Sequence, residues 1–371
     1  MKIVIDTSLL SRKPANGYAL FIYQLLQSVI KKYDKDDFIL IADQSHSPGF
    51  LFDEKVKTII TGPKISNRIQ HKYWYDIKVP SVLKKYQADI FVSPTGSCSF
   101  NTRIPQCIML PNLSFLHTSS LKKAQLFFFK RYMRKTIERA EGIIIFSNFS
   151  KTTILSNYQI NEEKLHVINS VAGDVFRCLD EDEKAAIKEQ YTDGKNYFIY
   201  ADSISPLRNL TNLLKAFSVF KKRQKTDWKL VLASNGVDKK FMESLRSYKY
   251  RDDIITVLVD REKQLALLLG AAYGMVHPSF CEDQYIPLLQ AMSSWIPVIT
   301  SPGSAFEEIA GDAALYADVT SHRDLAEKMM LLYKEETLRN QLIGKGKEIV
   351  AVNSRERSVT LFCEGILQAM K

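Results

Sequence analysis

The chain has 371 residues, of which 46% are hydrophobic and 25% are charged, a composition that is typical of a folded globular protein and excludes a disordered or fibrous one. Two domains are expected at this length. No run of eighteen apolar residues is present, and the start of the chain is too short and too soon charged for a signal peptide, so we expect a cytoplasmic protein. The five cysteines form no CxxC pair, so neither a disulfide framework nor a zinc site is expected.

The net charge of +10 is unevenly distributed along the chain. All of the basic excess lies before Arg177, and from there onward basic and acidic residues balance. An anionic partner accounts for such an excess, and so does solubility alone. We find no recognition-helix pattern, aromatic RNA-binding stretch or zinc finger, so nucleic acid is not an expected partner.

Strands and helices are predicted to alternate in the first half of the chain. Helical spacing of apolar residues begins at Tyr18, and again at the aromatic triplet Tyr73-Trp74-Tyr75, which we interpret as core or interface, with an acceptor groove as the alternative. Buried strands are expected at 2–6, 38–42, 56–61, 89–93, 107–110, 143–146 and 165–169. This alternation predicts a parallel sheet covered by helices.

The predicted helix 121–140 combines basic and aromatic residues. Glu138 is its single acid, and Phe127-Phe128-Phe129 and Tyr132 lie among its lysines and arginines. One apolar stripe of this helix is expected to face the core, and Phe127 or Phe128 then lies outside that stripe. Two interpretations stay open: peripheral contact with an anionic membrane surface, on its cytoplasmic face, or a solvated face beside a buried stripe.

An acidic connector divides the chain. We interpret Asp180-Glu181-Asp182-Glu183 as a solvated helix start rather than a metal site. The predicted organisation is a first domain over 1–175, a linker over 176–196, a second domain over 197–353 and a final helix over 354–371 that returns to the first domain. Strands of the second domain are expected at 197–201, 229–233, 254–258, 276–278 and 297–300.

The stretch 276–318 carries the strongest pattern. A buried strand ends at His277-Pro278, a turn holds Glu282 and Asp283, a helix is entered at Pro287, and a second strand follows. Ligands of such crossovers bind at the carboxyl ends of the strands, where the start of a helix attracts anions. A phosphate-bearing ligand is therefore expected.

The same stretch resembles the retaining glycosyltransferases of family four. The matching residues are Pro278-Ser279, Glu282, Pro287, Leu289, Ala291-Met292, Pro297-Val298-Ile299-Thr300-Ser301 and 308–315. The resemblance implies the α/β GT-B fold, in which two Rossmann-like doubly wound parallel-sheet domains face each other across a cleft. It also implies transfer of a hexose, with retention, from a nucleotide-diphosphate sugar to a saccharide or lipid-linked saccharide acceptor in surface polysaccharide biosynthesis, without a cofactor or metal.

The resemblance also implies roles for particular residues. Arg208 would hold the diphosphate, Glu282 would accept from sugar hydroxyls, and His117 would face the reacting centre. The remaining donor-binding positions are Gly17, Tyr285, Ile286 and Gln290. A helix-start glycine without a ligand and a loop histidine of structural role are the alternatives for Gly17 and His117.

Departures from the family pattern gather at the donor contacts. Asp202 replaces a glycine, Leu207 an arginine and Arg208 a lysine; Asp283-Gln284-Tyr285 replaces Gly-Phe-Gly, and Gln290 a glutamate. Two hypotheses follow: a hexosyltransferase with an altered donor site, or a weak or inactive homologue that acts as a partner or glycan-binding subunit.

Overall fold

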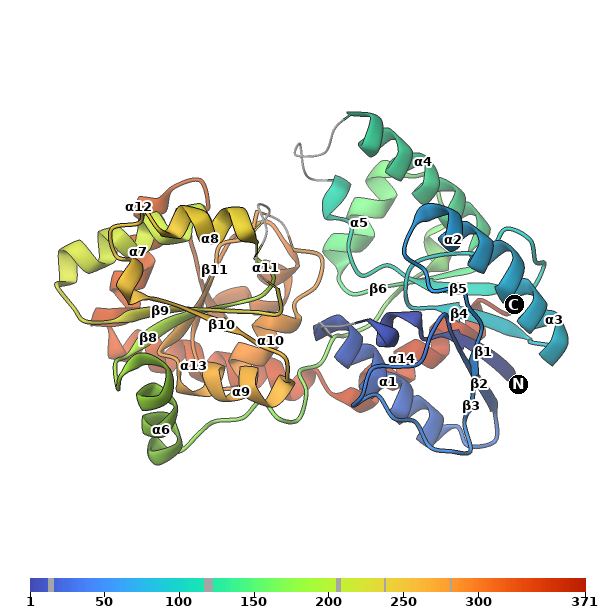
Figure 1. Ribbon diagram of the computed structural model, residues 1–371, viewed down its shortest axis with the longest axis horizontal. Helices are drawn as coiled ribbons and strands as arrows, with labels where there is room; N and C mark the ends of the chain where they lie inside the picture. Colours follow the sequence, from blue (N-terminus) through green and yellow to red (C-terminus); the bar gives the residue numbers. More distant parts are fainter. Residues whose placement is uncertain (13–16, 117–122, 205–207, 237, 281) are drawn as a thin grey trace. The chain divides into compact units, whose positions relative to one another are not determined.

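The computed structural model describes residues 1–12, 17–116, 123–204, 208–236, 238–280 and 282–371 (Figure 1). The chain folds as two compact units. The first comprises Met1–Ser170 and Arg355–Lys371, and the second comprises Val171–Ser354.

The first unit is built on a parallel seven-stranded sheet in the order β3-β2-β1-β4-β5-β6-β7. Ile5 of β1 lies opposite Leu40 on one side and Val92 on the other. The central strands are almost wholly apolar because helices cover both faces of the sheet. The strands are β1 (Lys2–Asp6), β2 (Asp37–Ala42), β3 (Lys57–Ile60), β4 (Ile90–Ser93), β5 (Gln106–Met109), β6 (Gly142–Ile145) and β7 (Leu165–Val167).

Helices pack on both faces of this sheet. On one face Trp74, Val79 and Leu83 pack against Val4 and Phe91. On the other, α1 and α14 pack together, and α14 contacts β6 and β7. The helices are α1 (Gly17–Lys32), α2 (Arg68–Tyr73), a π-helical turn (Trp74–Lys78), α3 (Val79–Tyr86), α4 (Lys123–Arg139), α5 (Asn148–Asn157) and α14 (Arg355–Gln368).

The second unit has a parallel six-stranded sheet in the order β10-β9-β8-β11-β12-β13. Its strands are β8 (Tyr197–Ala201), β9 (Lys229–Ser234), β10 (Ile254–Leu258), β11 (Gly274–His277), β12 (Val298–Thr300) and β13 (Ala314–Tyr316). Its helices are α6 (Glu181–Thr192), α7 (Leu210–Gln224), α8 (Lys239–Leu245), α9 (Glu262–Ala271), α10 (Ile286–Ser293), α11 (Ala305–Ala310), α12 (His322–Lys334) and α13 (Glu336–Val352). α7 packs against α12, whereas α9 and α13 both contact α10.

The segment 176–196, expected to be a linker, is instead part of the second unit. It contains α6, which packs against α9. Asp180 and Glu183 form a capping box at its start, which confirms the interpretation of the acidic run as a solvated helix start. The chain therefore passes between the units at Ser170–Val171 and again at Ser354–Arg355.

Both sheets are doubly wound, as the alternating pattern predicts: each sheet starts in its middle and grows outward in two directions. Within the described ranges, every helix is too short or too polar to cross a membrane.

Candidate active site

The candidate site lies where the second sheet changes winding direction. β8 and β11 are hydrogen-bonded neighbours, although much of the second unit separates them in sequence. The chain leaves β8 toward α7 and leaves β11 toward α10, so the two following loops diverge. Asp202 comes directly after β8, and Ser279 and Glu282 come after β11.

The loop after β11 is fixed by its neighbours. The Thr300 hydroxyl donates to the backbone carbonyl of His277 at 3.1 Å, and the Ser301 hydroxyl donates to that of Ser279 at 2.6 Å. The backbone N–H of Ala305 donates to the carbonyl of Glu282 at 3.0 Å. Thr300, at the end of β12, and Ser301, directly after it, therefore hold the loop after β11 in place.

His277 forms the floor of the site. Its ring is fully buried between Tyr200, at 5.4 Å between ring centroids, and Phe306, at 5.0 Å. Its Nε2 lies 3.0 Å from Glu282 Oε1 and 3.2 Å from the Ser279 hydroxyl. Because a carboxylate only accepts hydrogen bonds, Nε2 carries the proton and donates it to Glu282.

Arg208 reaches this floor from the loop after β8. The next residue, Asn209, has a left-handed backbone (φ 57°), and its side-chain amide donates to the carbonyl of Val319 at 2.7 Å. Asparagine tolerates this conformation better than most residues. The anchored turn directs Arg208 inward, where Nη1 bonds to Glu282 and Nη2 lies 2.8 Å from Asp202 Oδ2.

The arginine and Glu282 keep each other charged. Burial by itself would raise the pKa of Glu282, but the hydrogen bond from His277 and the charge of Arg208 outweigh it and hold that pKa below its ordinary value. Burial would lower the pKa of Arg208, and Glu282 and Asp202 outweigh that effect and raise it. The result is one partly buried cation held between two carboxylates.

Among the described residues, Asp202, His277 and Glu282 could also hold a metal ion, since their ligand atoms lie within 4.8 Å of one another. The guanidinium of Arg208 already bonds to both carboxylates. A metal ion would have to share that space with a positive charge, which is electrostatically unfavourable. Arg208 is therefore the cation that this group of residues suits best.

Three of the other expected donor-binding residues lie at or on α10. Tyr285 immediately precedes the helix, and Tyr285, Ile286 and Gln290 are all buried. The first hydrogen bond of the α10 ladder runs from Leu289 N–H to the Tyr285 carbonyl. The N–H groups of Ile286 and Leu288 therefore have no partner within the helix, and Pro287 has no N–H to offer.

The remaining expected residues belong to the first unit. Gly17 is the first residue of α1, and His117 lies outside the described residues. The structure thus brings Arg208 and Glu282 into direct contact, whereas the sequence pattern assigned them to different parts of the ligand. It adds His277, which the pattern did not single out; the signal was its position at the end of a buried strand, just before Pro278-Ser279.

The corresponding edge of the first sheet carries a buried carboxylate. Asp6, at the end of β1, accepts from the Ser8 N–H at 2.8 Å, the Tyr75 hydroxyl at 2.5 Å and the Thr95 hydroxyl at 3.1 Å. Burial raises the pKa of Asp6, and these hydrogen bonds oppose the rise. Tyr75 therefore has a structural role in the core, as expected; Trp74 is buried as well, whereas Tyr73, the first residue of the triplet, is 40% exposed.

Two histidines that the sequence pattern did not single out lie in the first unit. His46 Nε2 is 2.8 Å from the Thr7 hydroxyl, and His71 Nε2 is 3.0 Å from the Ser97 hydroxyl. Burial lowers the pKa of both imidazoles, so both are neutral at neutral pH and can donate and accept hydrogen bonds.

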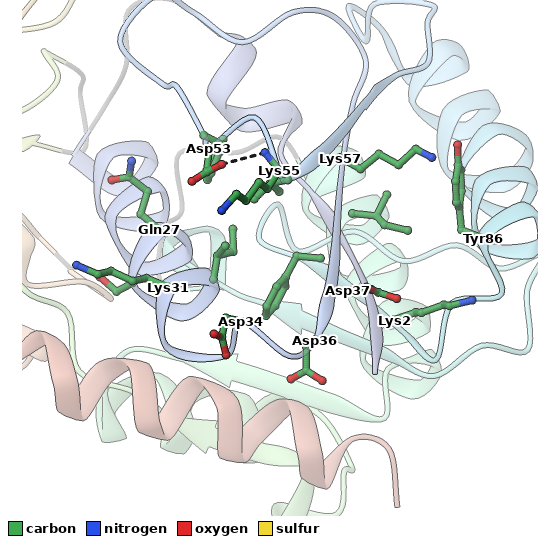
Figure 2. Close-up of a pocket in the computed structure, with 16 residues that line it drawn as sticks. Lys2, Gln27, Lys31, Asp34, Asp36, Asp37, Asp53, Lys55, Lys57 and Tyr86 are labelled. Atoms are coloured by element: carbon green, nitrogen blue, oxygen red, sulfur yellow. Dashed lines mark hydrogen bonds between the residues drawn. The ribbon is translucent and has the colours of Figure 1, made fainter.

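A pocket of about 980 Å³ opens elsewhere in the first unit (Figure 2). It is lined by the starts of the first three strands, at Lys2, Asp37 and Lys57, and by the last turns of α1. Figure 2 shows lysines and aspartates interspersed around it. Ligands of open parallel sheets bind at the opposite, carboxyl edge, so this pocket is not the candidate active site.

Solved structures share this fold over nearly the whole chain. WaaG, described as a glycosyltransferase involved in lipopolysaccharide biosynthesis, has a TM-score of 0.79 at 14% identity, over 98% of this chain and 99% of that chain. Anabaena Alr3699/HepE, in complex with UDP and glucose, has a TM-score of 0.77 at 15% identity, over 100% of this chain and 99% of that chain. At these identities the likeness shows the fold alone, and that fold is GT-B.

A protein-family model matches most of the second unit. Residues 181–349 match the family model "Glycosyl transferases group 1", and this range holds Arg208, His277 and Glu282. The match covers most of the second unit, Val171–Ser354.

Curated relatives agree with this placement. O-antigen chain mannosyltransferase B of Escherichia coli is 22% identical over 236 residues, 58% of this chain and 58% of that protein. O-antigen chain mannosyltransferase RfbU of Salmonella typhimurium is 25% identical over 196 residues, 52% of this chain and 51% of that protein. The chain matches between half and three fifths of the length of these relatives.

Proposed function

We propose that this protein transfers a hexose from a nucleotide-diphosphate sugar to a saccharide or lipid-linked saccharide acceptor, with retention at the anomeric carbon, in the synthesis of a surface polysaccharide. The observation that carries the proposal is Arg208, held inward at the switch point of a glycosyl transferases group 1 domain, between two carboxylates. Mannose is the first sugar to test, because the two relatives above are named mannosyltransferases.

In this proposal the site stabilises the leaving diphosphate. Negative charge builds up on the diphosphate as the glycosidic bond breaks, and Arg208 supplies a positive charge that is already in place. The N–H groups of Ile286 and Leu288 at the start of α10 add hydrogen-bond donors and the positive end of a helix dipole. Glu282 orients Arg208, and its carboxylate retains acceptor sites for a sugar hydroxyl.

The proposed reaction needs no metal ion, because Arg208 and the helix start take the role that a divalent cation would have. Activity should therefore survive treatment with EDTA. Loss of activity with EDTA and its recovery with magnesium or manganese would contradict this part of the proposal.

Two observations favour an enzyme over an inactive homologue. Arg208 points toward the loop after β11 rather than into solvent. Two departures from the family pattern, the added charge of Asp283 and the bulky side chain of Tyr285, are buried in the second unit, at 4% and 1% exposure. The names of the relatives are a third support.

We further propose that the first unit contacts an anionic membrane surface, where a lipid-linked acceptor would be found. Phe127, Phe128 and Phe129 of α4 are exposed, with Phe127 at 69%, although one core stripe was expected to bury at least one of them. The neighbouring α2 adds Ile69, which is 83% exposed, and Arg68, whose guanidinium lies 4.3 Å from the Phe128 ring centre. Such a basic and aromatic surface suits the interface of an anionic bilayer.

Calorimetric titration with UDP-, GDP- and ADP-sugars tests the main proposal. Submillimolar binding of one nucleotide sugar is expected, and Arg208→Met should weaken it by about a hundredfold or more, since a charged contact to the diphosphate is lost. Absence of binding across the whole panel would favour the inactive homologue.

A further inference from the structure

Asp202 occupies a position from which it controls Arg208. It follows β8 directly, and its Oδ2 lies 2.8 Å from Arg208 Nη2 and 3.9 Å from His277 Nε2. Its Oδ1 accepts from the backbone N–H of Ser203 at 2.5 Å. The family pattern has glycine here, and a glycine has no side chain with which to make this contact.

The two carboxylates together occupy both ends of the guanidinium. Nη1 bonds to Glu282 and Nη2 bonds to Asp202, while Nε has no hydrogen-bond partner within the described parts of the chain. Bidentate recognition of a phosphate uses two of these N–H groups at once. Because Nε is buried, a diphosphate that binds Arg208 through its Nη groups competes with Asp202 and Glu282 for them.

Asp202 is the carboxylate that can give way. The Glu282 side chain is 9% exposed and is also bonded by the buried His277. The Asp202 side chain is 22% exposed, and beyond Arg208 its hydrogen bond is to one backbone N–H next to it. Rotation of Asp202 toward solvent breaks fewer buried contacts than displacement of Glu282.

We propose that Asp202 is a positioning residue: it holds Arg208 in place while no donor is bound, and the diphosphate of the donor displaces it. This inference rests on the proposed function, because it takes the diphosphate site to be at Arg208. Asp202 then sets the affinity for nucleoside diphosphates, since its negative charge competes with the phosphates for one cation and repels them.

Replacement of Asp202 by asparagine tests the proposal. Asp202→Asn should bind GDP or UDP about tenfold more tightly than the wild type, because the competing charge is removed while the side-chain size is kept. The matching nucleoside monophosphates should gain much less, because the effect depends on the charge that reaches Arg208. Asp202→Glu should restore affinity close to that of the wild type.

Asp227→Asn is the matched control. Asp227 forms an exposed ion pair with Lys195 at 2.8 Å in the same unit, outside the group of side chains around Arg208. This variant should leave nucleotide binding unchanged. Binding is measured by calorimetry on the full-length chain, and a thermal melt of each variant confirms that it is folded.

The possible outcomes separate this inference from the proposed function. Tighter diphosphate binding by Asp202→Asn, including binding that appears only in that variant, supports the proposal. If the wild type binds a nucleoside diphosphate and Asp202→Asn binds it no more tightly, Asp202 is not a positioning residue, and the donor site stands. If neither protein binds any nucleotide, both the donor site and the role of Asp202 are rejected.

Discussion

The contact between Arg208 and Glu282 places two charges in the interior of the second unit. Removing ions from water is costly, and the cost is offset here because each charge has an opposite partner and a further hydrogen bond: His277 donates to Glu282, and Arg208 donates to the Ser279 hydroxyl. Such an ion pair adds little to the net free energy of unfolding, but removing one of its members is strongly destabilising. Loss of Arg208 leaves the Glu282 carboxylate buried without its cation, whereas loss of Glu282 leaves Arg208 with Asp202 as a partner.

Arg208→Met should destabilise the protein by about 3 kcal/mol, and Glu282→Gln should cost less, because Asp202 still pairs with Arg208. The double variant should lose clearly less than the sum of the two, because Glu282 is no longer left as a buried carboxylate without a cation. Urea unfolding of the four proteins measures this coupling. Additive losses would show that the two side chains do not form a pair in solution.

The ion pair between Arg208 and Glu282 also makes the stability of the protein depend on pH. The pKa of Glu282 is below its ordinary value of 4.5 in the folded protein, so the unfolded chain takes up a proton more readily. The stabilisation is therefore complete above about pH 4.5 and is lost as the pH falls below that value. Thermal melts between pH 7 and pH 3 should show a steeper decline for the wild type than for Glu282→Gln. Parallel curves for the two proteins would contradict the assignment.

The start of α7 depends on a single backbone conformation at Asn209. Asn209→Ala should cost about 2 kcal/mol, because alanine is strained at positive φ and the hydrogen bond to the Val319 carbonyl is lost. Asn209→Gly should cost about half as much, since glycine adopts this conformation freely and loses only the hydrogen bond. Urea unfolding compares the two variants. Equal losses of unfolding free energy in the two variants would show that the left-handed backbone conformation at this position does not contribute to stability.

The exposed surface of α4 and α2 leads to a prediction about membranes. Lys130, Arg131, Arg134 and Lys135 are all exposed on α4. Near an anionic bilayer each contributes about 1 kcal/mol, so changing all four to glutamine should reduce vesicle binding by roughly two to three orders of magnitude. Flotation with vesicles of phosphatidylglycerol and phosphatidylcholine measures this, and vesicles of phosphatidylcholine alone should bind far less.

A second set of charges serves as the control for this measurement. The exposed residues Lys239, Lys240, Arg246 and Lys249 lie in or near α8 of the second unit, and their neutralisation should leave flotation unchanged. Failure of the wild type to float with anionic vesicles would reject the membrane contact, and an equal loss in both variants would show a dependence on total charge rather than on α4.

Elements with strong apolar periodicity were predicted close to their observed bounds, whereas short polar ones were not. β2, β8 and β10 agree with the expected strands to within one residue at either end. α8 and α11 were not predicted, because short helices carry too few residues to show a period. α2 begins at Arg68, before the expected start at Tyr73. None of its residues is buried, so its sequence has no apolar stripe from which the helix could have been predicted.

At the scale of the whole molecule, the end of the chain completes the first unit. The last helix, α14, packs on α1, β6 and β7, and Gly142 permits its close approach: an added side-chain carbon there would lie 2.7 Å from Ala369 Cβ. Residues at the two ends of the chain therefore share one core, while the second unit is a continuous insertion between them.

Two residues of α14 test this arrangement. Phe362 is fully buried and Leu367 is 45% exposed, although they lie on the same helix. Phe362→Ala should destabilise the first unit by about 3 to 5 kcal/mol, and Leu367→Ala should have a small effect. Hydrogen exchange should show faster opening of β6 and β7 in the first variant, with the second unit unaffected. Equal exchange in both variants would mean that α14 does not contribute to that core.

The sequence by itself determined the alternation of strands and helices, the two-domain organisation and the site-bearing loop after β11, because apolar periodicity and the Pro278 to Ser301 pattern are local properties of the chain. Only the tertiary structure decided which side chains meet: Asp202 and Arg208 come from the loop after β8 and Glu282 from the loop after β11, and they converge because β8 and β11 are neighbours in the sheet. The tertiary structure also decided that α6 belongs to the second unit, because α6 packs on α9. It decided as well that the charges of Arg208 and Glu282 pair with each other. Pairing of strands and of charges is a long-range property, which no window of sequence contains.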